Sequence, residues 1–209
     1  MMLNERFTKG VNLQQRINTT FNEVFELPEK DFYASLDLDK LLKLKSALSD
    51  INSAISIKLA LEFLKWVSTA LSLGEQEIDM IRNDILQEAH KHQHYDIEHR
   101  SKYYRKSFVA EVKCRIPLLE GHRYGGAQKI RIWKDIEVLR EGHTKATFNP
   151  NAYRFMVFLD RPDIRDANNY LMSSCSKLPS YLEFIEDIQS LPSQPSNMVY
   201  GIYVQLESK

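Results

Sequence analysis

One segment of the chain, residues 108–116, combines a carboxylate and an ammonium group at a spacing that could support chemistry. Its apolar residues occupy every second position, which is the period of a β-strand, so Glu111 and Lys113 project from the same face. A carboxylate can hold a metal ion, and a lysine beside it can stabilise negative charge that develops on a phosphate. The segment is therefore the first candidate for a functional site.

A second acidic pair lies just before this segment. Asp96 and Glu98 alternate with apolar residues and share one face of a second short strand, and the polar stretch between the two strands is typical of a reversal. We therefore expect a β-hairpin. A turn centred near Tyr104 places Asp96 across from Lys113, and Glu98 across from Glu111.

An acidic residue in one strand, followed 15 residues later by E-x-K in the next strand and then by a helix, resembles the PD-(D/E)XK nuclease superfamily, which includes many restriction endonucleases and resolvases. The matching residues are Asp96, Glu111 and Lys113, and the resemblance covers roughly residues 75–160. Tyr95 stands where proline is common in the superfamily. The resemblance implies a restriction-endonuclease-like α/β core, in which helices flank a mixed sheet.

The resemblance also implies a metal-dependent hydrolysis of phosphodiester bonds. Mg²⁺, with Mn²⁺ as a substitute, would be held by Asp96, Glu111 and the backbone carbonyl of Val112. Lys113 would lie beside the metal-bound water and the scissile phosphate. Glu98 shares a strand face with Asp96, so which of the two is the first ligand stays open.

Two further polar residues fit this interpretation. Glu88 lies near the end of a predicted helix over residues 75–90, and in the superfamily this helix often adds an acidic metal ligand; an ordinary exposed glutamate is the alternative. Gln128 begins a stripe of residues in a predicted helix over 127–141, and some members of the superfamily carry a glutamine there, which implies a catalytic role. The rest of that stripe is apolar and comprises Ile132, Ile136 and Leu139.

The formal net charge of zero conceals a basic block in the middle of the chain. Residues 99–145 contain 12 Lys and Arg against 5 Asp and Glu, a net charge of +7. A local excess of this kind favours a phosphate-binding face, although a solvated charged surface is the alternative. The candidate nucleic-acid-binding residues are Arg100, Lys102, Arg105, Lys106, Arg115, Arg123 and Lys129.

Histidines and cysteines offer weaker alternatives. Four histidines lie within ten residues, so a zinc site competes with the simpler role of cations at a helix C-terminus; they are His90, His92, His94 and His99. Cys114 and Cys175 have neither metal-ligand spacing nor a nearby catalytic pattern. We expect both to be buried, reduced thiols.

The first part of the chain is predicted to be helical. Apolar residues four apart predict an amphipathic helix over residues 12–26 that ends before Pro28. Leucine and isoleucine then recur at three- and four-residue spacing over residues 36–73, which predicts two helices with a break at Ser49 or Asp50. Such a stripe is typical of a packed core or of a homodimer seam, and both remain open.

The predicted domains are a helical region over residues 1–74 and a restriction-endonuclease-like α/β core over residues 75–209. Within the core, the apolar run 155–159 predicts a central strand covered on both faces. The remaining elements are predicted as helices over residues 163–174 and 179–190 and a last strand over 198–206.

The sequence thus predicts a Mg²⁺-dependent nuclease, for which the resemblance favours DNA over RNA as the partner. A non-catalytic nucleic-acid-binding or scaffold protein with the same fold is the alternative. The start of the chain lacks a signal-peptide pattern, and its most apolar segment is interrupted by charged residues, so we expect a cytoplasmic protein without a membrane partner.

Overall fold

The computed structural model shows two compact units, Met1–Ile51 and Asn52–Lys209. The residues that it describes are 2–26, 31–87, 95–101, 106–117, 122–142 and 149–206.

The first unit contains helix α1 (Met2–Phe25), a 3-10 turn (Tyr33–Ser35) and the beginning of helix α2. The ring of Phe21 stacks on that of Phe32 with 4.5 Å between centroids, and the Asn18 side chain accepts a hydrogen bond from the Tyr33 N–H at 2.7 Å. The predicted amphipathic helix over residues 12–26 is confirmed as part of α1.

Helix α2 (Leu38–Ala70) is continuous, so the predicted break at Ser49 or Asp50 is wrong. Neither residue removes a backbone hydrogen bond as proline would, and both side chains are exposed, so the helix tolerates them. The division between the units also differs from the predicted boundary at residue 74. It falls earlier because Leu59 and Phe63 of α2 are buried in the core of the second unit.

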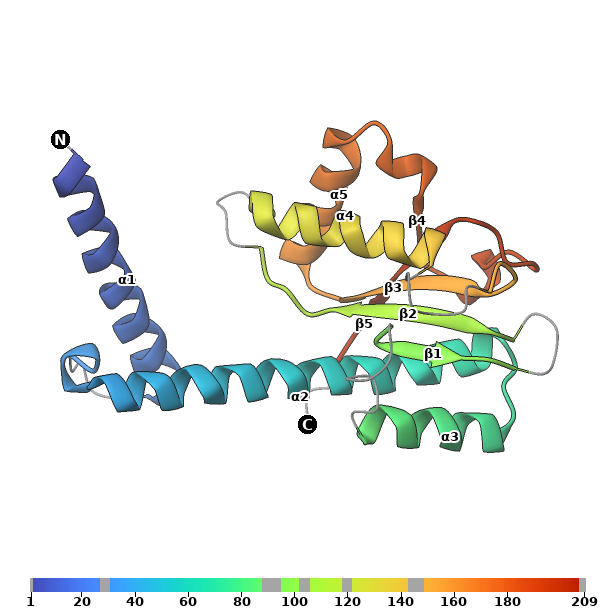
Figure 1. Cartoon of the computed structure of the whole chain (residues 1–209), viewed down its shortest axis with the longest axis horizontal. Coiled ribbons are helices and arrows are strands. Elements are labelled where there is room, and N and C mark those ends of the chain that lie inside the picture. Colours follow the sequence, from blue (N-terminus) through green and yellow to red (C-terminus); the bar gives the residue numbers. More distant parts are fainter. Residues whose placement is uncertain are drawn as a thin grey trace. The chain divides into compact units, whose positions relative to one another are not determined.

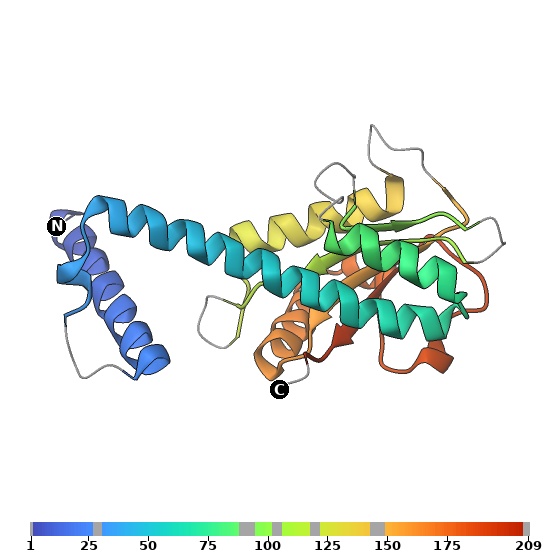
Figure 2. The ribbon, with the colours of Figure 1, turned by 90° about the horizontal axis from the view of Figure 1, so that it is seen from below.

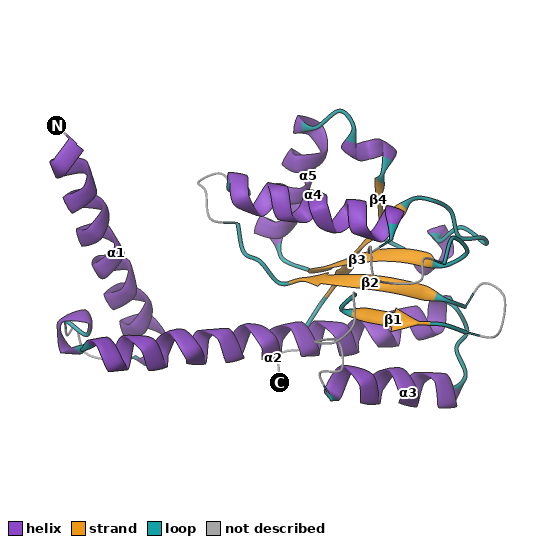
Figure 3. Cartoon of the chain, in the orientation of Figure 1, coloured by secondary structure: helices purple, strands orange, loops and turns teal. Residues whose placement is uncertain are grey.

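The second unit is built on one five-stranded mixed sheet with the order β1-β2-β3-β5-β4 (Figure 3). β1 pairs antiparallel with β2, and the other neighbouring strands are parallel. The carboxyl ends of four strands, β2, β3, β5 and β4, therefore lie at the same end of the sheet, which we call its carboxyl edge. The predicted mixed sheet is confirmed. The strands are β1 (Ile97–His99), β2 (Phe108–Lys113), β3 (Tyr153–Leu159), β4 (Leu182–Ile185) and β5 (Val199–Val204).

Helices cover both faces of this sheet, which makes the second unit a three-layer α/β arrangement. Helix α3 (Glu75–Leu86) and the α2 segment that begins at Asn52 cover one face (Figure 1). Helices α4 (Gly126–Glu141) and α5 (Pro162–Ser174) cover the other (Figure 2). The predicted helices over residues 127–141 and 163–174 are confirmed.

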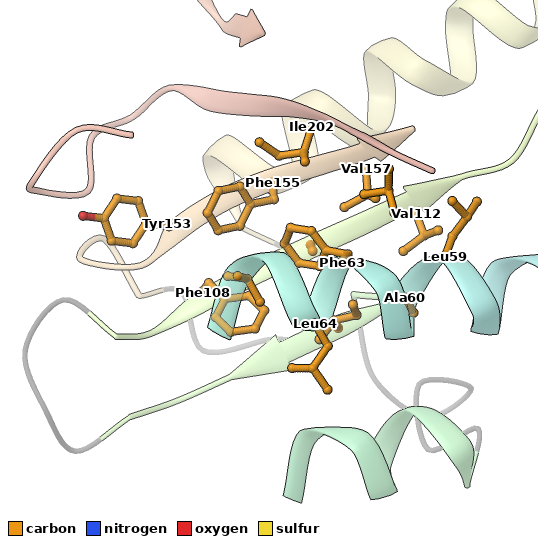
Figure 4. Close-up of a cluster of buried hydrophobic side chains, with 14 of the residues drawn as sticks. Leu59, Ala60, Phe63, Leu64, Phe108, Val112, Tyr153, Phe155, Val157 and Ile202 are labelled. Atoms are coloured by element: carbon orange, nitrogen blue, oxygen red, sulfur yellow. The ribbon is translucent and has the colours of Figure 1, made fainter. Parts of the chain in front are cut away.

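An aromatic cluster joins α2 to the sheet (Figure 4). The Phe63 ring of α2 meets Phe155 of β3 and Phe108 of β2 edge to face, with centroid distances of 5.3 and 6.0 Å. Edge-to-face pairs add to the hydrophobic gain of burial. A second core on the opposite face contains Ile132 and Ile136 of α4, so the sheet is buried on both sides as the apolar run of β3 predicted.

The helix predicted over residues 179–190 is wrong. The segment forms β4 between two 3-10 turns, Leu178–Ser180 and Ile188–Ser190. Parallel pairing with β5 overrides the helical spacing of its apolar residues. The predicted last strand is confirmed as β5.

Cys114 and Cys175 are free thiols, and both are half-buried. In the part of the chain that the structure describes, every helix is too short or too polar to span a bilayer.

Candidate functional site

Strand β2 directs its polar side chains toward α4. Phe108, Ala110 and Val112 are buried against the α2 face, so the alternate positions Glu111 and Lys113 turn to the opposite face. The predicted alternation of this strand is confirmed. Lys113 is the last residue of β2 and therefore lies at the carboxyl edge of the parallel strands, where open α/β sheets commonly bind their ligands.

The Lys113 ammonium group lies between two carboxylates. Its Nζ is 2.9 Å from Oε2 of Glu111 and 2.7 Å from Oδ2 of Asp135, a residue of α4. The exposed fractions of the three side chains are 14% for Lys113, 13% for Glu111 and 30% for Asp135. We call these three residues the acid–lysine cluster.

Asp135 was missed by the sequence prediction. It lies between the buried positions Ile132 and Ile136 of α4, so its carboxylate is at the border of the helix face that meets the sheet. A charged residue at the edge of a buried stripe needs a partner of opposite charge, and that signal could have identified it.

Burial shapes the ionisation of the cluster. The pKa of Glu111 is raised to about 7, and burial is the largest cause; Lys113 opposes the rise, whereas the charges of Asp96 and Asp135 contribute to it. Burial alone would lower the pKa of Lys113, but the two adjacent carboxylates outweigh this effect and raise it. Lys113 is therefore charged at neutral pH, while Glu111 titrates near neutrality.

Asp96 lies immediately before β1 and contacts the backbone of β2. Its Oδ2 accepts a hydrogen bond from the N–H of Val112 at 2.7 Å. Its charge is also close enough to contribute to the raised pKa of Glu111. The structure thus brings Asp96 to the same stretch of β2 as Glu111 and Lys113.

The predicted hairpin register is wrong by two residues. Glu98 lies opposite Val109, not Glu111, and its carboxylate accepts a hydrogen bond from Arg100 at 2.5 Å. A two-residue shift preserves the faces of both strands, so the alternation could not reveal it. Asp96 is therefore nearer than Glu98 to the acid–lysine cluster along the strand.

Gln128 is buried and bonded to the backbone at both ends of its amide. Oε1 accepts a hydrogen bond from the N–H of Gly125 at 2.9 Å, and Nε2 donates one to the carbonyl of Ile116 at 3.0 Å. These bonds cap the first turn of α4 and fix the segment that leaves β2. Glu88, the other predicted contributor, lies outside the described residues.

The candidate magnesium donors near Lys113 are the carboxylates of Asp96 and Glu111. Mg²⁺ commonly binds one or two carboxylates together with water and substrate phosphates, and Asp96 and Glu111 supply that donor type. Each uses one oxygen already, Asp96 with Val112 and Glu111 with Lys113. Across the described ranges of the chain, the structure contains no group of three or more His, Cys, Asp and Glu residues that could hold a metal.

The predicted nucleic-acid-binding residues fall into two groups. Arg100 pairs with Glu98, and Lys106 donates to the carbonyl of Ser72 and lies 4.0 Å from Glu77, so both contribute to local packing. The other three described residues of the set, Arg115, Arg123 and Lys129, belong to the segments that follow β2 and open α4, whereas Lys102 and Arg105 lie outside the described residues.

The ring of Tyr170, a residue of α5, contacts two of these cations. Tyr170 was not among the residues predicted to bind nucleic acid. The guanidinium carbon of Arg123 is 4.3 Å from the centre of the Tyr170 ring, and the ammonium of Lys129 is 5.0 Å from it. The aromatic ring holds two positive charges together by cation–π attraction. We call Arg123, Lys129 and Tyr170 the cationic–aromatic cluster.

His99 belongs to a separate polar group at the start of α3. Its Nε2 is 3.3 Å from Oε1 of Glu77, which also accepts a hydrogen bond from the Ser101 hydroxyl at 2.8 Å. Burial lowers the pKa of His99, and the Glu77 carboxylate only partly opposes this effect. The other three histidines of the alternative zinc site lie outside the described residues.

The chain matches no protein-family model, and no curated protein or solved structure matches it.

Proposed function

We propose that this protein is a metal-dependent nuclease that hydrolyses phosphodiester bonds, with DNA as its substrate, on a restriction-endonuclease-like core. The observation that carries the proposal is the placement of Glu111 and Lys113 at the carboxyl end of β2, where the Asp96 carboxylate, from just before β1, accepts a hydrogen bond from the Val112 N–H. The succession of an antiparallel hairpin, helix α4 and the parallel strand β3 supports the same assignment.

Glu111 and Asp96 would hold Mg²⁺ or Mn²⁺, together with the Val112 carbonyl. The ion would supply positive charge for the phosphate and a bound water of lowered pKa. Asp135 positions the Lys113 ammonium, which would orient the attacking water or stabilise charge on the phosphate. Glu111 would bind in its ionised form, so metal binding should release a proton near neutral pH.

The cationic–aromatic cluster would hold the DNA backbone. Lys129 lies in the first turns of α4, the helix that also carries Asp135, and Arg123 lies just before this helix. Cations in this position contact phosphates without reading sequence, so their contribution should weaken as salt is raised.

A cleavage assay with matched variants tests the proposal. Supercoiled plasmid, single-stranded DNA and RNA are incubated with the full chain and Mg²⁺, Mn²⁺ or EDTA. The test variants are Glu111→Gln and Lys113→Met. Their matched controls are Glu62→Gln and Lys65→Met, because Glu62 and Lys65 form an ordinary ion pair on α2 with 2.7 Å between Nζ and Oε2.

We expect metal-dependent cleavage of DNA that each test variant reduces about a hundredfold or more and that the controls leave unchanged. Equal activity in wild type and Lys113→Met, or no metal-stimulated cleavage of any substrate, would refute the proposal.

The alternative is a nucleic-acid-binding protein without catalysis. The observation that favours it is the tight pairing of Lys113 with both carboxylates, which is also what a structural ion cluster would show. DNA binding that depends on Arg123 and Lys129, but without cleavage or metal binding, would support this alternative.

A further inference from the structure

A groove of about 460 Å³ runs between α4 and α5, outside the acid–lysine cluster. This volume lies in the range of sites for small molecules. Most of its lining residues are apolar: Ile130, Ile132, Trp133, Leu171, Cys175 and Leu178.

The groove is lined by buried side chains at its floor and by an exposed apolar side chain at its rim. Ile132, Leu171 and Leu178 are buried in the core of the unit, so they form a rigid surface. Ile130 is 59% exposed although it is a large apolar residue on a helix. Ile130 therefore extends the apolar surface of the groove to solvent.

The charged residues of the lining favour an anionic partner. Lys129 and Lys134 both line the groove, and Glu137 is the acidic residue among the described lining. Oε1 of Glu137 accepts a hydrogen bond from Trp133 Nε1 at 2.6 Å, which uses part of its capacity to attract a cation. The two ammonium groups and the Glu137 carboxylate give the lining a net charge of +1 beside apolar walls.

We propose that this groove binds a free medium-chain carboxylate, with the apolar chain along Ile130 and Leu171 and the carboxylate near Lys129 or Lys134. Burial of the apolar chain provides most of the affinity, because it removes methylene groups from water. The lysines select the anionic head group. The proposal does not rest on the proposed catalytic residues, because none of the three residues of the acid–lysine cluster lines the groove; Lys129 is shared with the cationic–aromatic cluster.

Two measurements on the full chain test the groove. The first is calorimetric titration with dodecanoate, and with dodecyltrimethylammonium as a cation that has the same chain, both below their micelle concentrations. The second is the rate at which a thiol reagent labels Cys175, measured in a Cys114→Ser background so that only one cysteine reports. We expect dodecanoate to bind at least about tenfold more tightly than the cation and to slow the labelling.

Ile130→Glu introduces a negative charge into the groove at an exposed position, so it should fold normally and weaken dodecanoate binding at least about tenfold. Its matched control is Ile51→Glu on α2, where an isoleucine is 53% exposed and far along the chain from the groove. Lys134→Glu should reverse the preference between the two head groups.

Three results would overturn the proposal. They are the absence of dodecanoate binding, equal loss of binding in Ile130→Glu and Ile51→Glu, and binding of the protein to anionic vesicles without binding of free dodecanoate.

Discussion

Replacement of Glu111 by glutamine should remove a pH dependence of stability that the wild-type protein carries. The Glu111 carboxyl has an ordinary pKa of 4.5, and burial raises this pKa to about 7 in the folded protein. Between these values the folded protein keeps a proton that the unfolded chain releases. The stabilisation that the protonated Glu111 carboxyl provides is therefore complete below pH 4.5 and is lost as the pH rises through 7. A difference of about 2.5 pKa units corresponds to about 3 kcal/mol.

Urea denaturation of wild type and Glu111→Gln, in EDTA at about pH 4.5 and about pH 8, measures this term. We expect the free energy of unfolding of the wild type to fall by about 3 kcal/mol relative to that of the variant between the two pH values. Glu62→Gln, compared with wild type in the same way, controls for the loss of an ordinary ion-paired glutamate on α2. A difference between wild type and Glu111→Gln that does not change with pH would refute the assigned burial of this carboxyl.

Three further predictions concern stability. Lys113→Met should lower the free energy of unfolding at neutral pH by about 3 kcal/mol, because two half-buried carboxylates lose their cation. Urea denaturation measures this change, with Lys65→Met as the control variant. Phe63→Ala should cost about 3 to 5 kcal/mol through a cavity between α2 and the sheet, seen as a lower urea midpoint. Gly201→Ala should cost about 1 to 3 kcal/mol, because a Cβ there would lie 2.6 Å from the Phe184 ring; a melting temperature equal to that of wild type would contradict the packing of β4 on β5.

The sequence predicted the elements whose pattern is set by local periodicity. The alternation around Glu111 identified β2, and the buried stripe of Gln128 and its three apolar partners identified the inner face of α4. The prediction of secondary structure was wrong where pairing with a distant strand decides the conformation of a segment. The apolar residues Tyr181, Phe184 and Ile185 fit a helical spacing, yet the segment becomes β4 because β5 offers backbone hydrogen bonds along its edge.

The candidate site could be predicted in part for the same reason. Glu111 and Lys113 share a face because they lie two residues apart on one strand, so sequence spacing alone brings them together. Asp135 reaches the site only through the packing of α4 on the sheet, which spacing does not encode. The position of Asp96 depends on the register of the hairpin, and the alternation is identical for registers that differ by two residues.

The central claim, that Glu111 is a metal ligand, is tested most directly by calorimetric titration of Mn²⁺ into wild type, Glu111→Gln and Glu62→Gln at about pH 8. We expect saturable binding to wild type and to Glu62→Gln, with loss of at least about tenfold in affinity in Glu111→Gln. Equal Mn²⁺ binding by all three proteins, or no binding by the wild type, would contradict the claim.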